Sequence, residues 1–377
     1  MKKMDKKVLI VGPTPPPFHG VSFFTENLLT SELVKRFKVF HLDTSDRRRK
    51  PNMGRLDPTN MFLGFKHLFL IFYYNLVYHP SAVYIPISQN KLGFLRDGLF
   101  VLISAIFGSA VVIHLHGGIF DRFYNSTDPV TRFFICFVFK FVDRAIVLCN
   151  ALSNIFGDLL PKNKVRVVHN GVKESISDEE FLTALRKKMS DNRREFLVGF
   201  MGTLDKNKGF IDFIKSLPYV LTKFKNVKFS IAGKWHKKED KEESLDFLRN
   251  NNLEEFVQFM GVVRGEEKKK YLLESDIFVF PTKYYYEGQP IVVIEAMMAG
   301  LPVIVTPRAC LKEMIEDSKN GYIVPENSPE RIGEGIIKLL ENRKEWERIS
   351  LNNRKKFECE YRWEICVNSI EEILKEV

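Results

Sequence analysis

The chain has 377 residues, of which 45% are hydrophobic and 28% are charged, a composition typical of a soluble globular protein with room for two domains. Its net charge is +10, and the whole excess lies in residues 1–172, which hold 22 Lys and Arg against 11 Asp and Glu. A basic half favours an anionic partner; nucleic acid is excluded because no motif for it is present, which leaves a membrane surface or a phosphorylated substrate.

Short apolar runs alternate with helical patterns through the first half and predict six strands. They are residues 7–11, 39–43, 82–87, 110–115, 144–148 and 165–169. This alternation is typical of a doubly wound α/β domain. The loop after the first strand lacks the G-x-G-x-x-G fingerprint of dinucleotide binding. Gly20 in this loop either lets the backbone approach a ligand at the next helix start or serves an ordinary turn.

Three helical segments of the first half are aromatic and apolar: residues 61–79, 95–107 and 133–142. The uncharged stretch 98–113 is shorter than the ~20 residues that span a bilayer, and charge interrupts segment 61–79. We therefore expect no transmembrane helix. Together with the basic run 46–50, these helices favour docking on a membrane surface, although a simple core role explains part of the pattern. Lysines lead directly into the first strand without a signal peptide, so a cytoplasmic location is expected.

Two histidines end the strand at 110–115. Alternation places His114 and His116 on the same side at its carboxyl end, before Gly117 and Gly118. Such a histidine either binds a ligand at the sheet edge or has a structural role.

The second half repeats the strand pattern after a polar linker at about 173–195. Its predicted strands are residues 196–200, 227–232, 257–260, 277–280, 303–305 and 322–324. The chain is therefore predicted to form two doubly wound parallel sheets, with ligand where the carboxyl ends of their strands face each other.

One stretch, 277–300, carries the strongest functional signal. A buried strand is followed by a loop, and Pro290 suits the first position of a helix that ends at Gly300. Backbone N–H groups at such a helix start bind phosphates. Glu287 precedes the helix and Glu295 lies inside it, where an apolar setting makes a carboxylate costly unless it is paired. Ribose hydroxyls would suit Glu295; solvent or a core arginine are the alternatives.

The run EGQPIVVIEAMMAGLPVIVT resembles the signature of retaining glycosyltransferase family 4, which has the GT-B fold. The matching positions are Glu287, Gly288, Pro290, Glu295, Ala296, Met297, Gly300, Pro302 and Val303. The resemblance implies two Rossmann-like domains facing each other across a cleft. Residues 1–172 would form the acceptor-side domain, with the last helix, 361–377, packing back on it. Residues 173–360 would bind the nucleotide sugar.

The same resemblance implies roles for individual residues. The expected catalytic residues are His116, Glu287 and Lys208. The expected donor-binding residues are Gly20, Gly202, Thr203, Val263, Arg264, Gly288, Gln289, Pro290, Ile291 and Glu295. Thr203 stands where the family has an arginine on the donor diphosphate, so Lys208, the helix start, and Lys234 or Arg264 would have to neutralise it.

The implied activity is transfer of a sugar from a UDP- or GDP-sugar, with retention and without a metal or cofactor. The acceptor would be a glycan or a polyprenyl-diphosphate-linked sugar in surface polysaccharide assembly at the inner face of the cell membrane. Two alternatives remain open: a sugar-nucleotide epimerase of the same fold, and a sugar-nucleotide-binding relative without activity.

Overall fold

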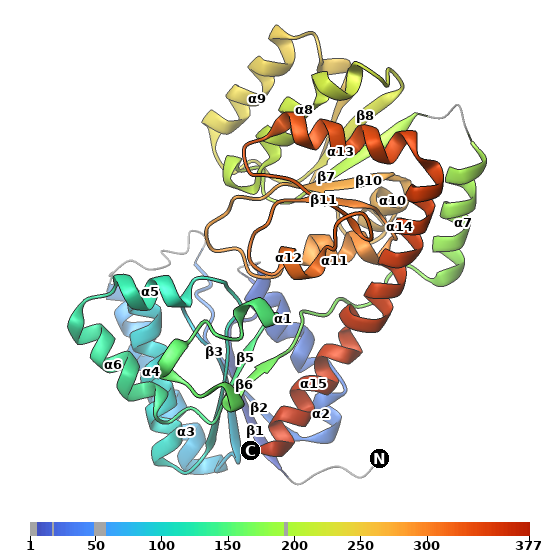
Figure 1. The fold of residues 1–377 in the computed structure, drawn as a ribbon. Helices are drawn as coiled ribbons and strands as arrows, with labels where there is room; N and C mark the ends of the chain where they lie inside the picture. Colours follow the sequence, from blue (N-terminus) through green and yellow to red (C-terminus); the bar gives the residue numbers. More distant parts are fainter. Residues whose placement is uncertain (1–5, 17–18, 49–57, 192–194) are drawn as a thin grey trace. The chain divides into compact units, whose positions relative to one another are not determined.

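The computed structural model describes residues 6–16, 19–48, 58–191 and 195–377. The chain divides into two compact units (Figure 1). The first unit comprises Met1–His169 with Glu364–Val377, and the second comprises Asn170–Trp363. The basic run 46–50 that was expected near the membrane lies only partly within the described residues, because Arg49 and Lys50 fall outside them.

Six parallel strands form the sheet of the first unit, in the order β2-β1-β3-β4-β5-β6. They are β1 (Lys7–Gly12), β2 (Lys38–Asp43), β3 (Ala82–Pro86), β4 (Ala110–His114), β5 (Arg144–Val147) and β6 (Val165–Val167). The inner strands are mainly apolar and are buried along most of their length, as in a sheet that is covered on both faces. The predicted doubly wound sheet is confirmed.

Helices cover both faces of this sheet. They are α1 (Gly20–Leu29), α2 (Leu33–Arg36), α3 (Pro58–Tyr78), α4 (Lys91–Ile106), α5 (Phe120–Ser126), α6 (Pro129–Phe139) and the final α15 (Trp363–Glu376). Helix α4 packs between α3 and α6 on one side of the sheet (Figure 1). Helices α2 and α15 lie on the other side, where Arg36 forms an ion pair with Glu371.

The second unit repeats this plan with the strand order β12-β11-β10-β7-β8-β9, again all parallel. Its strands are β7 (Phe196–Met201), β8 (Val227–Ala232), β9 (Val257–Gly261), β10 (Ile277–Phe280), β11 (Val303–Val305) and β12 (Gly321–Ile323). Its helices are α7 (Asp178–Ser190), α8 (Phe210–Leu221), α9 (Lys238–Asn250), α10 (Gly265–Glu274), α11 (Ile291–Met298), α12 (Leu311–Met314), α13 (Pro329–Glu341) and α14 (Arg343–Lys356). Helices α8 and α13 pack together, and α11 packs against α14.

Two local predictions are wrong. The polar linker contains helix α7, which begins with a capping box between Ser177 and Glu180 and buries Phe181 and Leu185 on its inner face. Four-residue spacing places these two side chains on one face, which is enough for an amphipathic helix in an otherwise polar segment. Pro290 is the cap of α11 rather than its first residue, so the helix starts one position later.

Candidate functional site

The carboxyl ends of all six strands of the second unit share one edge of its sheet. From β7 the chain continues to β8 and β9 on one side, then crosses to β10, β11 and β12 on the other. The crevice between β7 and β10 is therefore a topological switch point, where doubly wound sheets bind their ligands. The loops after these two strands, 202–209 and 281–290, supply most of the predicted site.

A lysine from one loop meets a glutamate from the other. Lys208 Nζ lies 2.8 Å from Glu287 Oε2, and the Thr282 hydroxyl donates to the same oxygen at 2.9 Å. Lys208 Nζ also lies 4.1 Å from the centre of the Tyr284 ring, a cation–π distance. The Glu287 side chain is nearly buried, and these partners offset the cost of removing its charge from water. The two predicted catalytic residues of this unit are thus brought together.

The two loops are also joined through their backbones. The Lys283 N–H donates to the Asn207 carbonyl at 2.8 Å. Gly209 has φ of +79°, and a Cβ there would lie 2.0 Å from the carbonyl oxygen of Pro281. Only glycine fits this left-handed position against the neighbouring chain, so the closeness of the loops depends on it.

Asn170 forms two hydrogen bonds with Gln289, the residue that precedes the cap of α11. Its backbone N–H donates to Gln289 Oε1 at 2.6 Å, and its side-chain amide donates to the Gln289 carbonyl at 3.1 Å. Pro290 then caps the helix and Ile291 begins it. The first N–H groups of a helix have no partners within it, so this end is suited to an anion. Gly288, Gln289, Pro290 and Ile291 therefore lie together at the switch-point edge.

Glu295 has a partner that the sequence did not reveal. Its Oε1 lies 2.5 Å from Nζ of Lys268 on α10. The alternatives of solvent or a core arginine are therefore both wrong, because a lysine from another helix pairs with this carboxylate. Lys268 stands within three consecutive lysines, a run that looks solvated, and its spacing from Glu295 gives no local signal.

The remaining donor-side residues follow strands of the same sheet. Gly202 and the exposed Thr203 come directly after β7, and the neighbouring Leu204 N–H donates to the Lys234 carbonyl after β8 at 2.9 Å. Val263 is buried after β9, and Arg264 caps α10, the helix that carries Lys268. Thr203 supplies no cation, but three lysines follow strands at this edge: Lys208 in the loop after β7, Lys234 in the loop after β8, and Lys268 on α10.

Two predicted residues belong to the first unit. Gly20 is the first residue of α1, and His19 caps that helix by accepting from the Ser22 N–H at 3.3 Å. Phe24 of the same helix contacts the rings of both His114 and His116. Gly20 and His116 are therefore brought to one edge by α1.

The two strand-end histidines stack with ring centres 4.0 Å apart. The Tyr84 hydroxyl lies within hydrogen-bonding distance of His114 Nδ1. Within the described residues, Nε2 of His116 is buried without a hydrogen-bond partner. Burial lowers the pKa of His116 to about 3, with a smaller effect from His19, so its ring is neutral at pH 7. It is thus suited to hydrogen bonding rather than to binding as a cation.

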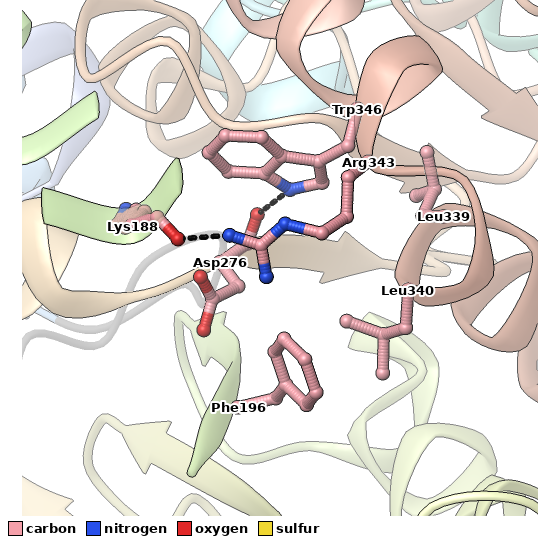
Figure 2. Close-up of a pocket in the computed structure, with 7 residues that line it drawn as sticks. All are labelled: Lys188, Phe196, Asp276, Leu339, Leu340, Arg343 and Trp346. Atoms are coloured by element: carbon pink, nitrogen blue, oxygen red, sulfur yellow. Dashed lines mark hydrogen bonds between the residues drawn. The ribbon is translucent and has the colours of Figure 1, made fainter. Parts of the chain in front are cut away.

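A small pocket lies at the opposite edge of the second sheet (Figure 2). It is lined near the beginning of β7 by Phe196 and just before β10 by Asp276, with Lys188, Leu339, Leu340, Arg343 and Trp346 around them. The Trp346 indole N–H donates to the Asp276 carbonyl at 2.8 Å, and Arg343 donates to the carbonyl of Lys188 (Figure 2). These polar groups tie α7 and α14 to the sheet, and the pocket is separate from the switch-point site. The residues that the structure describes contain no cluster of three or more metal-binding side chains.

Comparison with known proteins shows which family model and which relatives this chain resembles. Residues 182–356 match the family model "Glycosyl transferases group 1". An uncharacterized glycosyltransferase of Methanocaldococcus jannaschii, MJ1607, is 31% identical over 209 residues, which cover 54% of this chain and 52% of the relative. A second from that organism, MJ1178, is 24% identical over 98% of both chains. The chain thus spans about half of the first relative and nearly all of the second.

A biosynthetic enzyme and a solved structure extend the comparison. The capsular polysaccharide biosynthesis glycosyltransferase CapM of Staphylococcus aureus is 28% identical over 59% of each chain. The crystal structure of Anabaena Alr3699/HepE with UDP superposes with a TM-score of 0.72 at 17% identity, covering 98% of this chain and 100% of that one. The latter likeness confirms the predicted GT-B fold. Residues 182–356 thus match the glycosyl transferases group 1 model, and the relatives that this chain resembles are named glycosyltransferases.

Proposed function

We propose that the protein transfers a sugar, with retention of configuration and without a metal, from a UDP- or GDP-sugar to a glycan or lipid-linked acceptor of surface polysaccharide. The observation that carries the proposal is the Lys208–Glu287 pair at the switch point, 2.8 Å apart and beside the start of α11. A cation and a helix N-terminus stabilise a diphosphate, and a carboxylate can accept hydrogen bonds from sugar hydroxyls, so the three groups together suit a sugar diphosphate. The name of CapM and the UDP in the HepE structure agree with this substrate class.

The reaction breaks the bond between the anomeric carbon and the diphosphate oxygen. Negative charge grows on the departing diphosphate, and Lys208 with the N–H groups at Ile291 would stabilise it as preorganised donors. Within the second unit, Glu287 and the Gly288 and Gln289 amides would hold the sugar hydroxyls. Glu295 would accept from the ribose, with Val263 and Arg264 near the base.

Retention requires that the acceptor enters on the face from which the diphosphate leaves, or that a covalent intermediate forms. We favour the first route, in which the acceptor hydroxyl bonds to the anomeric carbon and its proton passes to the departing phosphate oxygen. Thr282 and Lys208 already occupy Glu287 Oε2, so this carboxylate is suited to orientation rather than to nucleophilic attack.

The first test is a thermal-shift screen of the purified protein against UDP, GDP and their sugars. A ligand at 100 times its Kd stabilises the folded state by about 2.7 kcal/mol, so the true donor should raise Tm clearly. The second step incubates the stabilising sugar nucleotide with acceptors, with and without EDTA, and reads the anomeric configuration by NMR. Inversion, or loss of turnover in EDTA, would contradict that part of the proposal.

The same experiment separates the alternatives. Conversion of the sugar nucleotide to another sugar nucleotide without acceptor would identify an epimerase. Donor binding without transfer to any acceptor would identify a binding relative. We further propose that the enzyme acts in the cytoplasm at the inner face of the membrane, where lipid-linked acceptors are available.

A further inference from the structure

Helix α3 carries aromatic side chains on the face that points away from its sheet. Phe62, Phe65 and Phe69 are each 68% exposed, and their spacing of three and four residues places them in one stripe. The opposite face packs on the protein, where Ile71 and Asn75 are fully buried. An ordinary surface helix is apolar on one face only, so the outer stripe of α3 needs a partner.

The neighbouring helices of the same layer extend this apolar surface. On α4, Ile106 is 80% exposed, and on α6, Phe133 is 74% exposed. The rings of Phe72 and Phe107 meet edge to face at 5.2 Å, which joins α3 to the end of α4. Fourteen of the 21 large hydrophobic side chains exposed among the described residues lie on or beside these helices. They are Met61, Phe62, Phe65, Phe69, Phe72, Tyr73, Leu76, Val77, Leu99, Ile106, Val130, Phe133, Phe137 and Phe141. We call this set the aromatic face.

The charges within this layer are almost all positive. Lys66 lies exposed among the aromatic residues of α3, and Lys140 lies exposed at the end of α6. Neither α3 nor α6 contains an acidic residue, and α4 contains one, Asp97, which is buried and paired with Arg96. Asp128, which caps α6, pairs with Lys91 of α4 at 2.7 Å, whereas no ion pair is found for Lys66 or Lys140 among the described residues. These two lysines are therefore the cations of the aromatic face that remain open to an anionic partner.

This combination fits an anionic bilayer better than a second copy of the chain. A twofold dimer through this face would bring identical lysines together, whereas anionic headgroups would pair with them. Phenylalanines flanked by lysines are also the side chains that amphipathic helices place at the boundary between headgroups and acyl chains.

By length and composition, residues Met61–Tyr78 would also suffice to span a membrane, with only 17% of the segment buried in the protein. The sequence argument against a membrane span assumed that charge interrupts this segment, but the helix continues through Gly64 and Lys66. Its inner face nevertheless is tied to the unit: the Ser109 hydroxyl donates to Asn75 Oδ1 at 3.0 Å, and the side chains of Ile71 and Asn75 are fully buried against the protein. A spanning helix would have to leave these contacts, so α3 is placed to lie in the plane of the membrane.

We propose that the aromatic face of α3, α4 and α6 docks the protein on an anionic lipid bilayer, with the phenylalanines entering the headgroup boundary and Lys66 and Lys140 contacting lipid phosphates. The surface is distinct from the switch-point site, and docking needs neither donor nor acceptor. Within the basic run at 46–50, the described Arg47 and Arg48 contribute less than the sequence suggested, because Arg47 is paired with Asp43 and Arg48 with Asp46.

The test is sedimentation of the full chain with vesicles of phosphatidylcholine alone or with 30 mol% phosphatidylglycerol (about a third anionic, chosen to resemble the leaflet that such surfaces bind). The wild type should bind the anionic vesicles, and binding should weaken as salt rises. Phe62→Ser/Phe65→Ser/Phe69→Ser should weaken binding by at least ~100-fold, because three apolar anchors are lost. Lys66→Ser/Lys140→Ser should weaken it by roughly 30-fold.

Two control variants and one further measurement complete the test. Leu182→Ser/Leu351→Ser removes exposed apolar side chains from the second unit and should bind as the wild type does. Arg47→Ser/Arg48→Ser should change affinity less than the two lysine substitutions. Sedimentation velocity without lipid should show the same oligomeric state for the wild type and the phenylalanine variant. The proposal is overturned if the wild type ignores anionic vesicles at low salt, or if the phenylalanine variant dissociates a dimer and leaves vesicle binding unchanged.

Discussion

The two units have the same doubly wound topology but use their helix layers differently. In the second unit, α13 buries Ile332, Ile336 and Leu339 and turns its charged residues outward, as a surface helix normally does. In the first unit, α3 is apolar on both faces, and its most exposed side chains are phenylalanines. The fold dictates only the inner face of each helix. The outer face is free to differ, and that is where the units have diverged in surface chemistry.

Charge follows the same division. Residues 173–377 hold 35 Lys and Arg against 36 Asp and Glu, and two opposite-charge pairs lie at the switch point, Lys208 with Glu287 and Lys268 with Glu295. Residues 1–172, by contrast, contain 22 Lys and Arg residues and only 11 Asp and Glu residues. We therefore expect substitutions at the switch point of the second unit to affect turnover but not membrane binding. Substitutions on the aromatic face should affect membrane binding but not turnover.

The largest expected effect compares two phenylalanines. Phe213 on α8 is fully buried and stacks on Phe229 with ring centres 4.3 Å apart. Phe213→Ala should lower the free energy of unfolding by about 3–5 kcal/mol, because it leaves a cavity. Phe65→Ala, on the aromatic face, should change it by less than about 0.5 kcal/mol. Urea unfolding of both variants measures the difference, and an equal loss would mean that Phe65 is packed in solution.

Glu287→Gln should lower kcat by at least ~100-fold while the protein remains folded and still binds anionic vesicles, because in the proposed reaction its charge acts at the reacting sugar. Steady-state kinetics, circular dichroism and vesicle sedimentation check the three parts. Activity within a few-fold of the wild type would remove Glu287 from the site.

Lys208→Ala should cost about 2–4 kcal/mol of transition-state stabilisation, since Thr203 supplies no second cation. Thr203→Arg should be neutral or activating, as it restores a charge at that loop. The ratios of kcat/KM for these variants measure both effects. A harmless Lys208→Ala would shift the task of neutralising the diphosphate to Lys234 or Lys268.

The smallest expected effect is the loss of folding stability at acidic pH. Burial lowers the pKa of His67 on α3 to about 4, aided by Arg96 and Lys66. Since its folded pKa lies below the ordinary 6.5, the unfolded chain binds a proton first, and stability falls as pH drops through 6.5 toward 4. Lowering pH from 7.5 to 5.5 should cost about 1 kcal/mol through this residue. His67→Leu should flatten the dependence of unfolding free energy on pH; an unchanged slope would contradict the assignment.

Much of the fold followed from local patterns. Each strand of the second sheet was predicted within one residue at either end, because a buried parallel strand is a short continuous apolar run between breakers. Helix α7 was missed because its segment is mostly polar. It buries only two apolar side chains, Phe181 and Leu185, which is too few to give a clear helical pattern in the sequence. Loop residues such as Glu287 and Lys208 were found through a resemblance, whereas the Lys268–Glu295 pair joins two helices and leaves no trace in sequence spacing.

The crowding at Gly209 has a consequence for engineering. Its absent side chain lets the segment after β7 rest against the carbonyl of Pro281, so the segments 202–209 and 281–290 form one module built from distant parts of the chain. Grafting one of them from a related protein should fail unless the other is transplanted with it. A chimera library for this protein should therefore exchange the two segments as a pair and retain glycine at position 209.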